Sequence, residues 1–348
     1  MQKKRIILLG VLFILSIVVN CSKDKSSPTE PEIDPVPEPT EDFWKLKSDM
    51  PTAKYPVAVT VNDKIYLMGG VSNTKGSIIY TTVDEYDPAT ETWTAKAEMP
   101  RQRWCFAACA LDGKIHVAGG KKEGGEEHVD SSAIDWHDVF DPQANTWETK
   151  ASMEFPRMLL SLCALNGKLY AIGGVYNYHS LDIAVYAAVE EYDPATDTWT
   201  RKADLKTKRY SQEAQVAGGK IFVIGGNNVN TKGGTDVEST VEVYDSATDS
   251  WTAAPDIPTY RDAYRSGVID GKIYVVGGYV PWSGTTAAIK MNEMFDPATN
   301  TWTEKADMKK AVNWPGVCAC NGKLYVFGGG EANGYGVPPF AYVQEYTP

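Results

Sequence analysis

The chain has 348 residues, of which 43% are hydrophobic, and it carries 34 Lys and Arg against 45 Asp and Glu, a formal net charge of −11. A chain of this length has room for two or three domains, or for one large all-β unit. Its acidic balance and its lack of a basic stripe argue against a nucleic-acid-binding protein and against adhesion to anionic lipid by charge alone.

The first twenty residues have the pattern of an export signal. Three cationic residues at 3–5 precede a mainly apolar stretch at 6–19, which is too short for a typical membrane-spanning helix. The tetrapeptide Val-Val-Asn-Cys that ends at Cys21 resembles the lipobox of bacterial lipoproteins, although Asn20 stands where a smaller residue is commoner. The resemblance implies a lipidated Cys21 and an exported protein anchored in the bacterial cell envelope, at the outer membrane or cell surface. The alternative is a plain secretory signal with an incidental cysteine.

Residues 22–42 have the composition of a tether. They contain five prolines, nine charged residues and no aromatic residue. Such a segment cannot bury enough apolar surface to offset the entropy of ordering it. We therefore expect a signal peptide at 1–20, a lipidated cysteine with a disordered tether at 21–42, and a folded region at 43–348.

The folded region repeats itself. Its 306 residues correspond to six periods of 51. Glycine doublets recur at intervals of 50 to 54 residues, at Gly69-Gly70, Gly119-Gly120, Gly173-Gly174, Gly225-Gly226, Gly277-Gly278 and Gly328-Gly329. Tryptophans keep the same period, at Trp44, Trp93, Trp147, Trp199, Trp251 and Trp302.

Each period contains the signals of four antiparallel strands. Pairs such as Asp270-Gly271 separate two short apolar runs and favour the type I′ turn of a tight hairpin, because both residues adopt positive φ. A turn opened by Asp-Pro in most repeats then joins a third strand, which ends in Tyr or Phe, to a fourth strand that carries the Trp. One such sheet has two apolar faces, so the units must stack and close into a ring. The prediction is an all-β fold, a six-bladed β-propeller of four-stranded antiparallel blades.

The last copy of the repeat stops early. Residues 343–348 contain Tyr346, but the tryptophan expected seven positions later is missing. Trp44 has no third strand of its own before it. We therefore expect the N-terminal strand around Trp44 to complete the last blade, so that the ring closes and no blade is lacking.

The repeat resembles the kelch motif of β-propellers, in which a glycine doublet ends the second strand and a spaced aromatic residue and tryptophan follow. The spaced pairs here are Tyr86 with Trp93, Phe140 with Trp147, Tyr192 with Trp199, Tyr244 with Trp251 and Phe295 with Trp302. Segments of 15 to 19 residues between doublet and aromatic share one face, the loop face, with the connections between blades, whereas the tight hairpin turns share the opposite turn face. Variable loops on a rigid scaffold usually carry the binding groups.

Ten residues after five of the six tryptophans stands a cation: Lys54, Arg103, Arg157, Arg209 and Arg261, with Val312 in the sixth place. These positions begin the innermost strands, so we expect the side chains near the mouth of the central channel on the loop face. With Arg265 they form a candidate site for an anionic ligand. The alternative is structural, with the cations bonding backbone carbonyls or pairing with acidic groups between blades.

Glu213 is a candidate acid/base. Period-two alternation places Arg209 and Glu213 on one side of an innermost strand, with Arg261 and Arg265 in matching phase on the next. Glu213 either pairs with these arginines and stays ionised, or faces a bound sugar acid. Similarity to the bacterial N-acetylneuraminate epimerases, kelch enzymes that interconvert sialic acid anomers without a cofactor, implies the second role.

Other chemistry has weaker support. His116 replaces a Tyr or Phe and is expected to be packed. The second long loop is expected to hold His128, Asp130, Asp135 and His137, after Glu126 and Glu127, and these side chains could take a divalent cation. Their spacing matches no established site, so a solvated loop is expected and no metal is predicted. The copper site of galactose oxidase, another kelch propeller, needs paired Tyr and His ligands, and the chain has only four His. The propeller cysteines are expected to be small apolar strand residues: Cys105, Cys109, Cys163, Cys318 and Cys320.

The aromatic residues expected in the loops include Tyr176, Tyr178, Tyr279 and Trp282. They suit stacking on a carbohydrate or anchoring of a peptide, and they could equally cover the tops of the blades. The function predicted from the sequence is that of a surface-anchored, monomeric binding module without a cofactor, recognising a protein or glycan through the loop face. The alternative is a cofactor-free sugar-acid epimerase. Contact with the membrane is expected only through the lipid anchor.

Overall fold

The computed structural model describes residues 42–73, 78–122, 133–177, 183–229, 235–281, 287–332 and 337–348. The predicted export signal, Cys21 and almost all of the tether lie outside these residues and remain predictions. Across the described residues no helix is long and apolar enough to cross a membrane.

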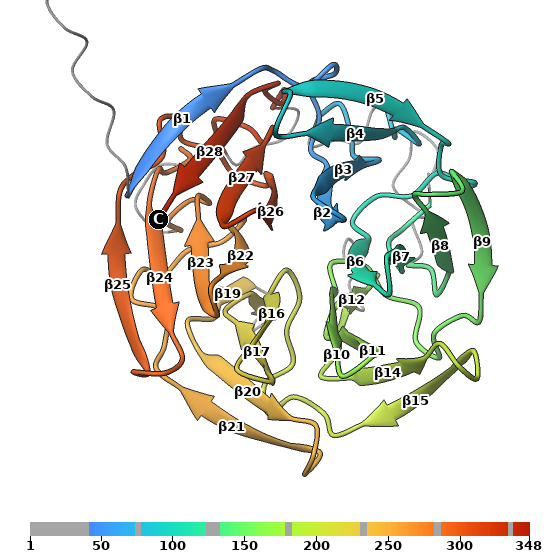
Figure 1. Ribbon diagram of the computed structural model, residues 1–348. Helices are drawn as coiled ribbons and strands as arrows, with labels where there is room; N and C mark the ends of the chain where they lie inside the picture. Colours follow the sequence, from blue (N-terminus) through green and yellow to red (C-terminus); the bar gives the residue numbers. More distant parts are fainter. Residues whose placement is uncertain are drawn as a thin grey trace, which may run out of the picture. The chain divides into compact units, whose positions relative to one another are not determined.

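Six four-stranded antiparallel sheets surround a central axis as blades, which confirms the predicted six-bladed propeller (Figure 1). From the innermost to the outermost strand they are blade 1, β2 (Val57–Val61), β3 (Lys64–Met68), β4 (Val83–Asp87) and β5 (Thr92–Lys96); blade 2, β6 (Ala107–Leu111), β7 (Lys114–Ala118), β8 (His137–Asp141) and β9 (Thr146–Lys150); and blade 3, β10 (Ser161–Leu165), β11 (Lys168–Ile172), β14 (Val189–Asp193) and β15 (Thr198–Lys202). The others are blade 4, β16 (Glu213–Ala217), β17 (Lys220–Ile224), β20 (Val241–Asp245) and β21 (Ser250–Ala254); blade 5, β22 (Arg265–Ile269), β23 (Lys272–Val276), β24 (Asn292–Asp296) and β25 (Thr301–Lys305); and blade 6, β26 (Gly316–Cys320), β27 (Lys323–Phe327), β28 (Val343–Thr347) and β1 (Phe43–Lys47).

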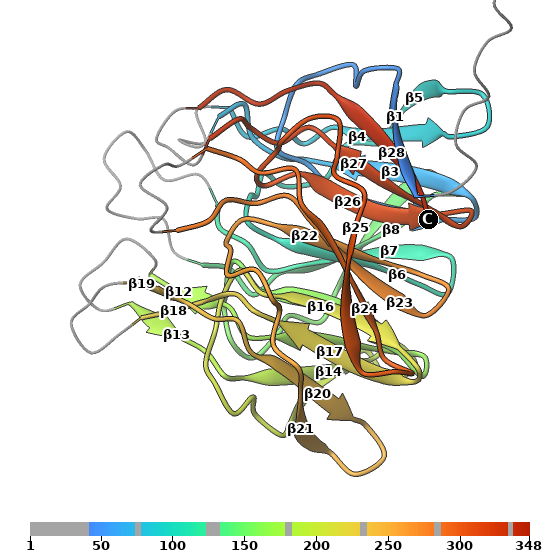
Figure 2. The same ribbon diagram turned by 90° about the vertical axis from the view of Figure 1, so that its left-hand side faces the viewer.

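Two short ribbons extend blades 3 and 4. They are β12 (Val175–Tyr176) with β13 (Ala184–Val185), and β18 (Asn227–Val229) with β19 (Thr235–Val237). Figure 2 shows all four of these strands on one side of the ring. Because they follow the glycine doublets, this side is the loop face.

The N-terminal strand closes the ring, as predicted. In β1, Trp44 lies opposite Tyr346 of β28, and their ring centroids are 5.0 Å apart. Trp44 is 2% exposed. The first and last segments of the folded region therefore share one sheet.

The turns and doublets explain why glycine recurs. The hairpin turns have positive φ at both central residues, for example 50° at Asp112 and 75° at Gly113, as the type I′ assignment requires. In the doublets the constraint is close approach: a Cβ on Gly119 would lie 2.5 Å from the Arg157 carbonyl oxygen of the next blade. The doublets therefore allow the close approach of adjacent blades.

Hydrophobic packing between blades forms the core. Each of six buried clusters combines residues of two neighbouring blades, as where Ile172 of blade 3 packs with Ile221 of blade 4. Each blade buries both faces against its neighbours, so stability depends on the intact ring.

A repeated contact, called the latch below, joins the outer edges of successive blades. In blade 3, the Trp199 indole donates to the carbonyl of Ala151, 2.8 Å away, and the Asp197 carboxylate accepts the amide of the same Ala151 at 2.9 Å. Equivalent latches hold three other residues: Ala97 by Trp147 and Asn145, Ala203 by Trp251 and Asp249, and Ala306 by Trp44 and Asp42.

Two junctions lack a full latch. Pro255 accepts from the Trp302 indole but has no amide to donate. Between blades 6 and 1, the buried Trp93 indole nitrogen has no partner among the described residues. At that junction Glu91 instead forms an ion pair with Lys47, at 2.5 Å.

Candidate binding site at the loop face

The five predicted ligand-binding cations at the starts of the innermost strands are buried. Lys54, Arg103, Arg157, Arg209 and Arg261 are each at most 1% exposed. Each forms an ion pair with a carboxylate on the third strand of its own blade: Asp84, Asp138, Glu190, Glu242 and Glu293, respectively. Arginines 157, 209 and 261 also donate to backbone carbonyls of the glycine doublets. The structure therefore corrects the proposed anion ring, since these groups are already neutralised away from solvent.

The sixth blade supports this structural interpretation. Where the others have a cation, it has Val312, and where they have a carboxylate it has Gln344. The Gln344 amide instead accepts the Lys310 amide N–H at 2.8 Å and donates to the Lys310 carbonyl at 3.1 Å. Loss of the cation thus coincides with loss of the matching charge.

Glu213 lies beside one arginine and not among three. Arg209 and Arg261 are held by Glu242 and Glu293, so only Arg265 faces Glu213, with 3.5 Å between Nη1 and Oε1. Ser266 donates to the other carboxylate oxygen from its amide and its hydroxyl, at 3.1 and 2.9 Å. Burial raises the pKa of Glu213, while Arg265 and Ser266 oppose that rise.

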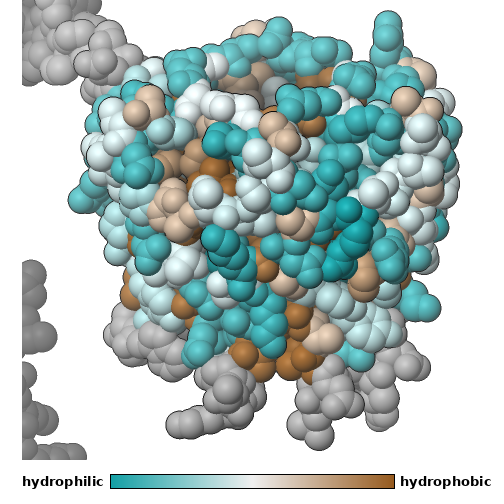
Figure 3. Space-filling view, turned by 90° about the horizontal axis from the view of Figure 1, so that it is seen from below, coloured by the Kyte–Doolittle hydropathy of each residue, from teal (hydrophilic) through white to brown (hydrophobic). Residues whose placement is uncertain are grey.

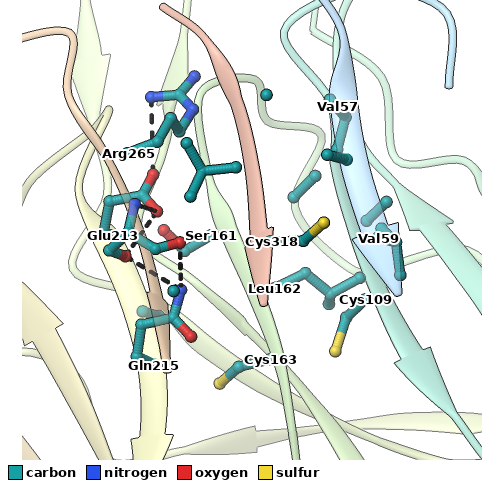
Figure 4. Close-up of a pocket in the computed structure, with 18 of the residues that line it drawn as sticks. Val57, Val59, Cys109, Ser161, Leu162, Cys163, Glu213, Gln215, Arg265 and Cys318 are labelled. Carbon is teal, nitrogen blue, oxygen red and sulfur yellow. Dashed lines mark hydrogen bonds and ion pairs between the residues drawn. The ribbon is translucent and has the colours of Figure 1, made fainter. Parts of the chain in front are cut away.

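The central channel beneath the mouth is a cavity of about 420 Å³ with two unlike walls (Figure 4). One wall carries Glu213, Gln215 and Ser161 beside Arg265, and the labelled residues across from them are aliphatic or carry thiols. Gln215 donates to the Ser266 carbonyl and hydroxyl oxygens at 3.1 and 3.0 Å. Polarity is therefore concentrated on the side of blades 3 to 5.

The mouth of the channel is formed by one backbone-paired residue pair from each blade, called the rim pairs. They are Tyr55 with Val71, Trp104 with Lys121, Met158 with Val175, Tyr210 with Asn227, Asp262 with Tyr279, and Asn313 with Gly330. Members of five of these pairs line a second cavity of about 250 Å³, together with Arg265 and Trp314. The rim pairs differ in chemistry from blade to blade, whereas the ion pairs behind them recur.

A set of residues with positive φ beside the two cavities was not predicted. Two positions after each cation place, five blades have a residue other than glycine with φ between 51° and 59°: Cys105, Leu159, Ser211, Ala263 and Trp314. Such residues rarely adopt this conformation. The amide of Leu159 donates to Cys105 and that of Ser211 to Leu159, both at 2.8 Å, so hydrogen bonds run from blade to blade. The residue types at these positions do not predict positive φ, because contacts between blades and not local sequence impose this conformation.

The mouth concentrates charge next to aromatic rings. The Lys121 ammonium lies 3.9 Å from the centroid of Trp104, and the Arg265 guanidinium lies 5.0 Å from that of Trp314. Asp262 accepts hydrogen bonds from Asn227, at 2.8 Å, and from Tyr279, at 3.1 Å. Burial raises the pKa of Asp262 and lowers that of Lys121. Lys121, Trp104 and Trp314 were not among the predicted site residues, although the divergence between repeats at these positions was a readable signal.

The predicted loop aromatics divide into two groups. Tyr279 lies in the rim, and half-buried Tyr176 packs beside Met158 and Tyr210. Tyr178 and Trp282 lie outside the described residues. On the outer wall shown in Figure 3, hydrophilic residues predominate and hydrophobic ones are scattered or gathered toward the lower edge.

The two histidines and five thiols in the described part of the chain are packed. His116 is buried, as expected, and its Nδ1 lies 2.9 Å from Nε2 of His137, which begins β8 and does not lie in the loop. Within the described ranges no three His, Cys, Asp or Glu side chains converge as for a metal. The five propeller cysteines are free thiols, and burial raises the pKa of Cys109 and of Cys318 to about 12.

Comparison with known proteins agrees with this architecture. A family profile described as "KLHDC2/KLHL20/DRC7 Kelch-repeats domain" matches residues 42–226, and one described as "Kelch motif" matches 208–258 and 261–309. Over 78% of its own length, the chain is 31% identical to mouse "Kelch-like protein 35". Over 84% of its own length, it is 28% identical to "Kelch-like protein terF" of Aspergillus terreus. It spans only 42% and 63% of those two relatives. A solved structure titled "Structure of YjhT" superposes with a TM-score of 0.69 at 17% identity, covering 86% of this chain and 99% of that one, which shows a shared fold.

Proposed function

Because the chain belongs to the kelch-repeat family of β-propellers, we propose that it is a binding module that recognises a protein or glycan partner through its loop face. The observation that carries this proposal is the divergence of the six rim pairs around the mouth cavity, in front of ion pairs that recur in five blades. Recurrent positions maintain the scaffold, and divergent positions are free to fit a partner.

The chemistry of the mouth suits recognition. Half-buried Trp104 and Trp314 offer flat apolar area at low entropic cost, with Lys121 and Arg265 beside them. The turn face, in contrast, repeats one arrangement, an ion pair between a second-strand lysine and a turn aspartate, as in Lys114 with Asp141 and Lys168 with Asp193. Because the residues of the loop face differ from blade to blade, we favour the loop face over the turn face as the binding surface.

The proposed place of action is the bacterial cell envelope, with the propeller tethered through lipidated Cys21. The signal-like first twenty residues and the lipobox-like residues before Cys21 support this. Fractionation of cells that produce the full chain tests it: a Cys21→Ser variant should leave the membrane fraction, and retention there would refute the anchor.

Glycan and peptide arrays probed with wild type and two double variants test the binding function. Trp104→Ala/Trp314→Ala removes the aromatic rings of the mouth, and Lys114→Ala/Lys168→Ala is the matched control on the turn face. The expected result is loss of array binding in the first variant and retention in the second. Binding that survives loss of both tryptophans, or that fails in the turn-face control, would overturn the loop-face assignment.

A second candidate function is the cofactor-free isomerisation of a sugar acid by Glu213. A carboxyl whose pKa is raised by burial, beside Arg265 in a cavity, is the observation that favours it. Anomer exchange of N-acetylneuraminate followed by NMR tests it. Exchange no faster than in buffer, or unchanged in Glu213→Gln, would rule this function out.

A further inference from the structure

Lys121 is a buried lysine without a counter-ion in the described part of the chain. Lys121 is 4% exposed and lines the mouth cavity. Among the described residues, its ammonium has a close contact only with the Trp104 ring. Lys54, the other lysine buried among the described residues, has the Asp84 carboxylate at 2.7 Å. A buried charge without a counter-ion is costly, so an anionic group in the cavity would stabilise the Lys121 ammonium.

Arg265 is a second incompletely paired cation in the same cavity. Its side chain is 29% exposed, its ion pair with Glu213 is 3.5 Å long, and it donates to the Tyr264 carbonyl at 2.9 Å. Lys121 and Arg265 both line the mouth cavity, as does Cys105.

The scaffold does not require either cation. The places of Lys121 in the other blades hold Val71, Val175, Asn227, Tyr279 and Gly330. Those of Arg265 hold Val57, Ala107, Ser161, Glu213 and Gly316. Each place thus lacks a cation in five of the six blades, and four blades have a cation at neither place.

We propose that the mouth cavity binds a carboxylate group between Lys121 and Arg265, with the carrier of that group against Trp104 and Trp314; this rests on the proposed binding function. The cavity, at about 250 Å³, is smaller than the usual drug-sized site, so it takes one acidic group and its immediate carrier. The guanidinium fork of Arg265 matches a carboxylate. The chain as a whole is acidic, at −11, so attraction is local to these two cations.

Two polar atoms at the mouth narrow the choice of carrier. The buried Ser211 hydroxyl and the Asn227 Oδ1 line the cavity without hydrogen-bond partners among the described residues. Asn227 Oδ1 accepts only, so it suits a hydroxyl or amide N–H next to the carboxylate. A sugar acid and an acidic amino-acid residue both carry that combination.

Titration calorimetry of the full chain with matched probes tests the proposal. Glucuronate is compared with glucose, and N-acetylglutamate methylamide with N-acetylglutamine methylamide, so each acid has a neutral counterpart and the two arms distinguish sugar from peptide sources. At least one acid should bind about tenfold or more tightly than its counterpart, and Lys121→Met and Arg265→Gln should each remove that preference. Lys114→Met on the turn face should retain it.

The melting temperature without ligand separates a binding lysine from a structural one. Lys121→Met keeps most of the side-chain volume and removes the unpaired charge, so it should melt at or above the wild-type temperature. A clear fall in melting temperature would identify Lys121 as structural and contradict the proposal.

Two outcomes of the calorimetry would also contradict it: neither acid binds, or acid and neutral probe bind equally. Suppose that the calorimetry gave one of these outcomes and that array binding was still lost in Trp104→Ala/Trp314→Ala. The carboxylate proposal would then be wrong, whereas the proposed loop-face binding function would stand. If array binding survived in Trp104→Ala/Trp314→Ala, the proposed loop-face binding function would be wrong as well.

Discussion

Buried cations in five blades determine how the loop face is organised. Their sequence spacing predicted them at the starts of the innermost strands, and they lie three or four residues before those strands begin. Their role depends on carboxylates about thirty positions later, which only the pairing of strands brings close. A signal was present: the carboxylates lie nine residues before each tryptophan, and the one blade with Val312 has Gln344 there. Reading the two positions together would have predicted ion pairs within each blade.

The His116–His137 pair should make stability depend on pH. Burial lowers the pKa of His116 to about 3 and that of His137 to about 4, from an ordinary 6.5, and the two rings also repel each other's charge. Since the unfolded chain takes up these protons first, the pair favours folding fully above about pH 6.5 and loses that contribution as pH falls toward about 3.

Urea unfolding at pH 7 and pH 5 measures this effect. His116→Tyr/His137→Val installs the residues found at the equivalent places in blade 3, Tyr170 and Val189. The wild type should lose more free energy of unfolding between the two pH values than the variant. Equal losses would show that the pair does not control acid sensitivity.

The latches show how one element holds the next. The sequence predicted the strands and turns, because alternation and Asp-Gly pairs are local signals, and it predicted the repeating tryptophans. It did not predict that an indole and a turn carboxylate would both form hydrogen bonds with one residue of the preceding blade. The ribbons β12–β13 and β18–β19 were also missed, since segments of two or three residues carry little periodicity.

Trp199 and Trp93 give a matched test of the latch. Trp199→Phe removes a donor and leaves the Ala151 carbonyl unpaired, so it should cost about 1–3 kcal/mol beyond the loss of ring area. Trp93→Phe removes an indole nitrogen that already lacks a partner in the described structure and should cost less. Denaturant midpoints of the two variants compare the costs directly, and a Trp93→Phe variant as unstable as Trp199→Phe would refute the latch.

The whole molecule depends on closure of the ring by β1. Deletion of Phe43–Lys47 removes buried Trp44, whose loss alone should cost about 3–5 kcal/mol, and exposes the edge of β28. We expect the entire propeller to melt at a lower temperature in a calorimetric scan. The control Leu46→Lys, at a side chain that is 51% exposed, should melt close to the wild type. A deletion variant that melted like the parent would show that β1 does not close the ring.

A rigid scaffold with its ligand site at the mouth should respond to ligand at the loop face alone. Hydrogen–deuterium exchange of the full chain, with and without a ligand identified on the arrays, measures where that response occurs. We expect added protection at the rim pairs, above all in peptides that contain Trp104, Lys121 and Trp314, and none at the turn-face hairpins around Asp112 and Asn166. Protection confined to the turn face or to the outer strands would contradict it.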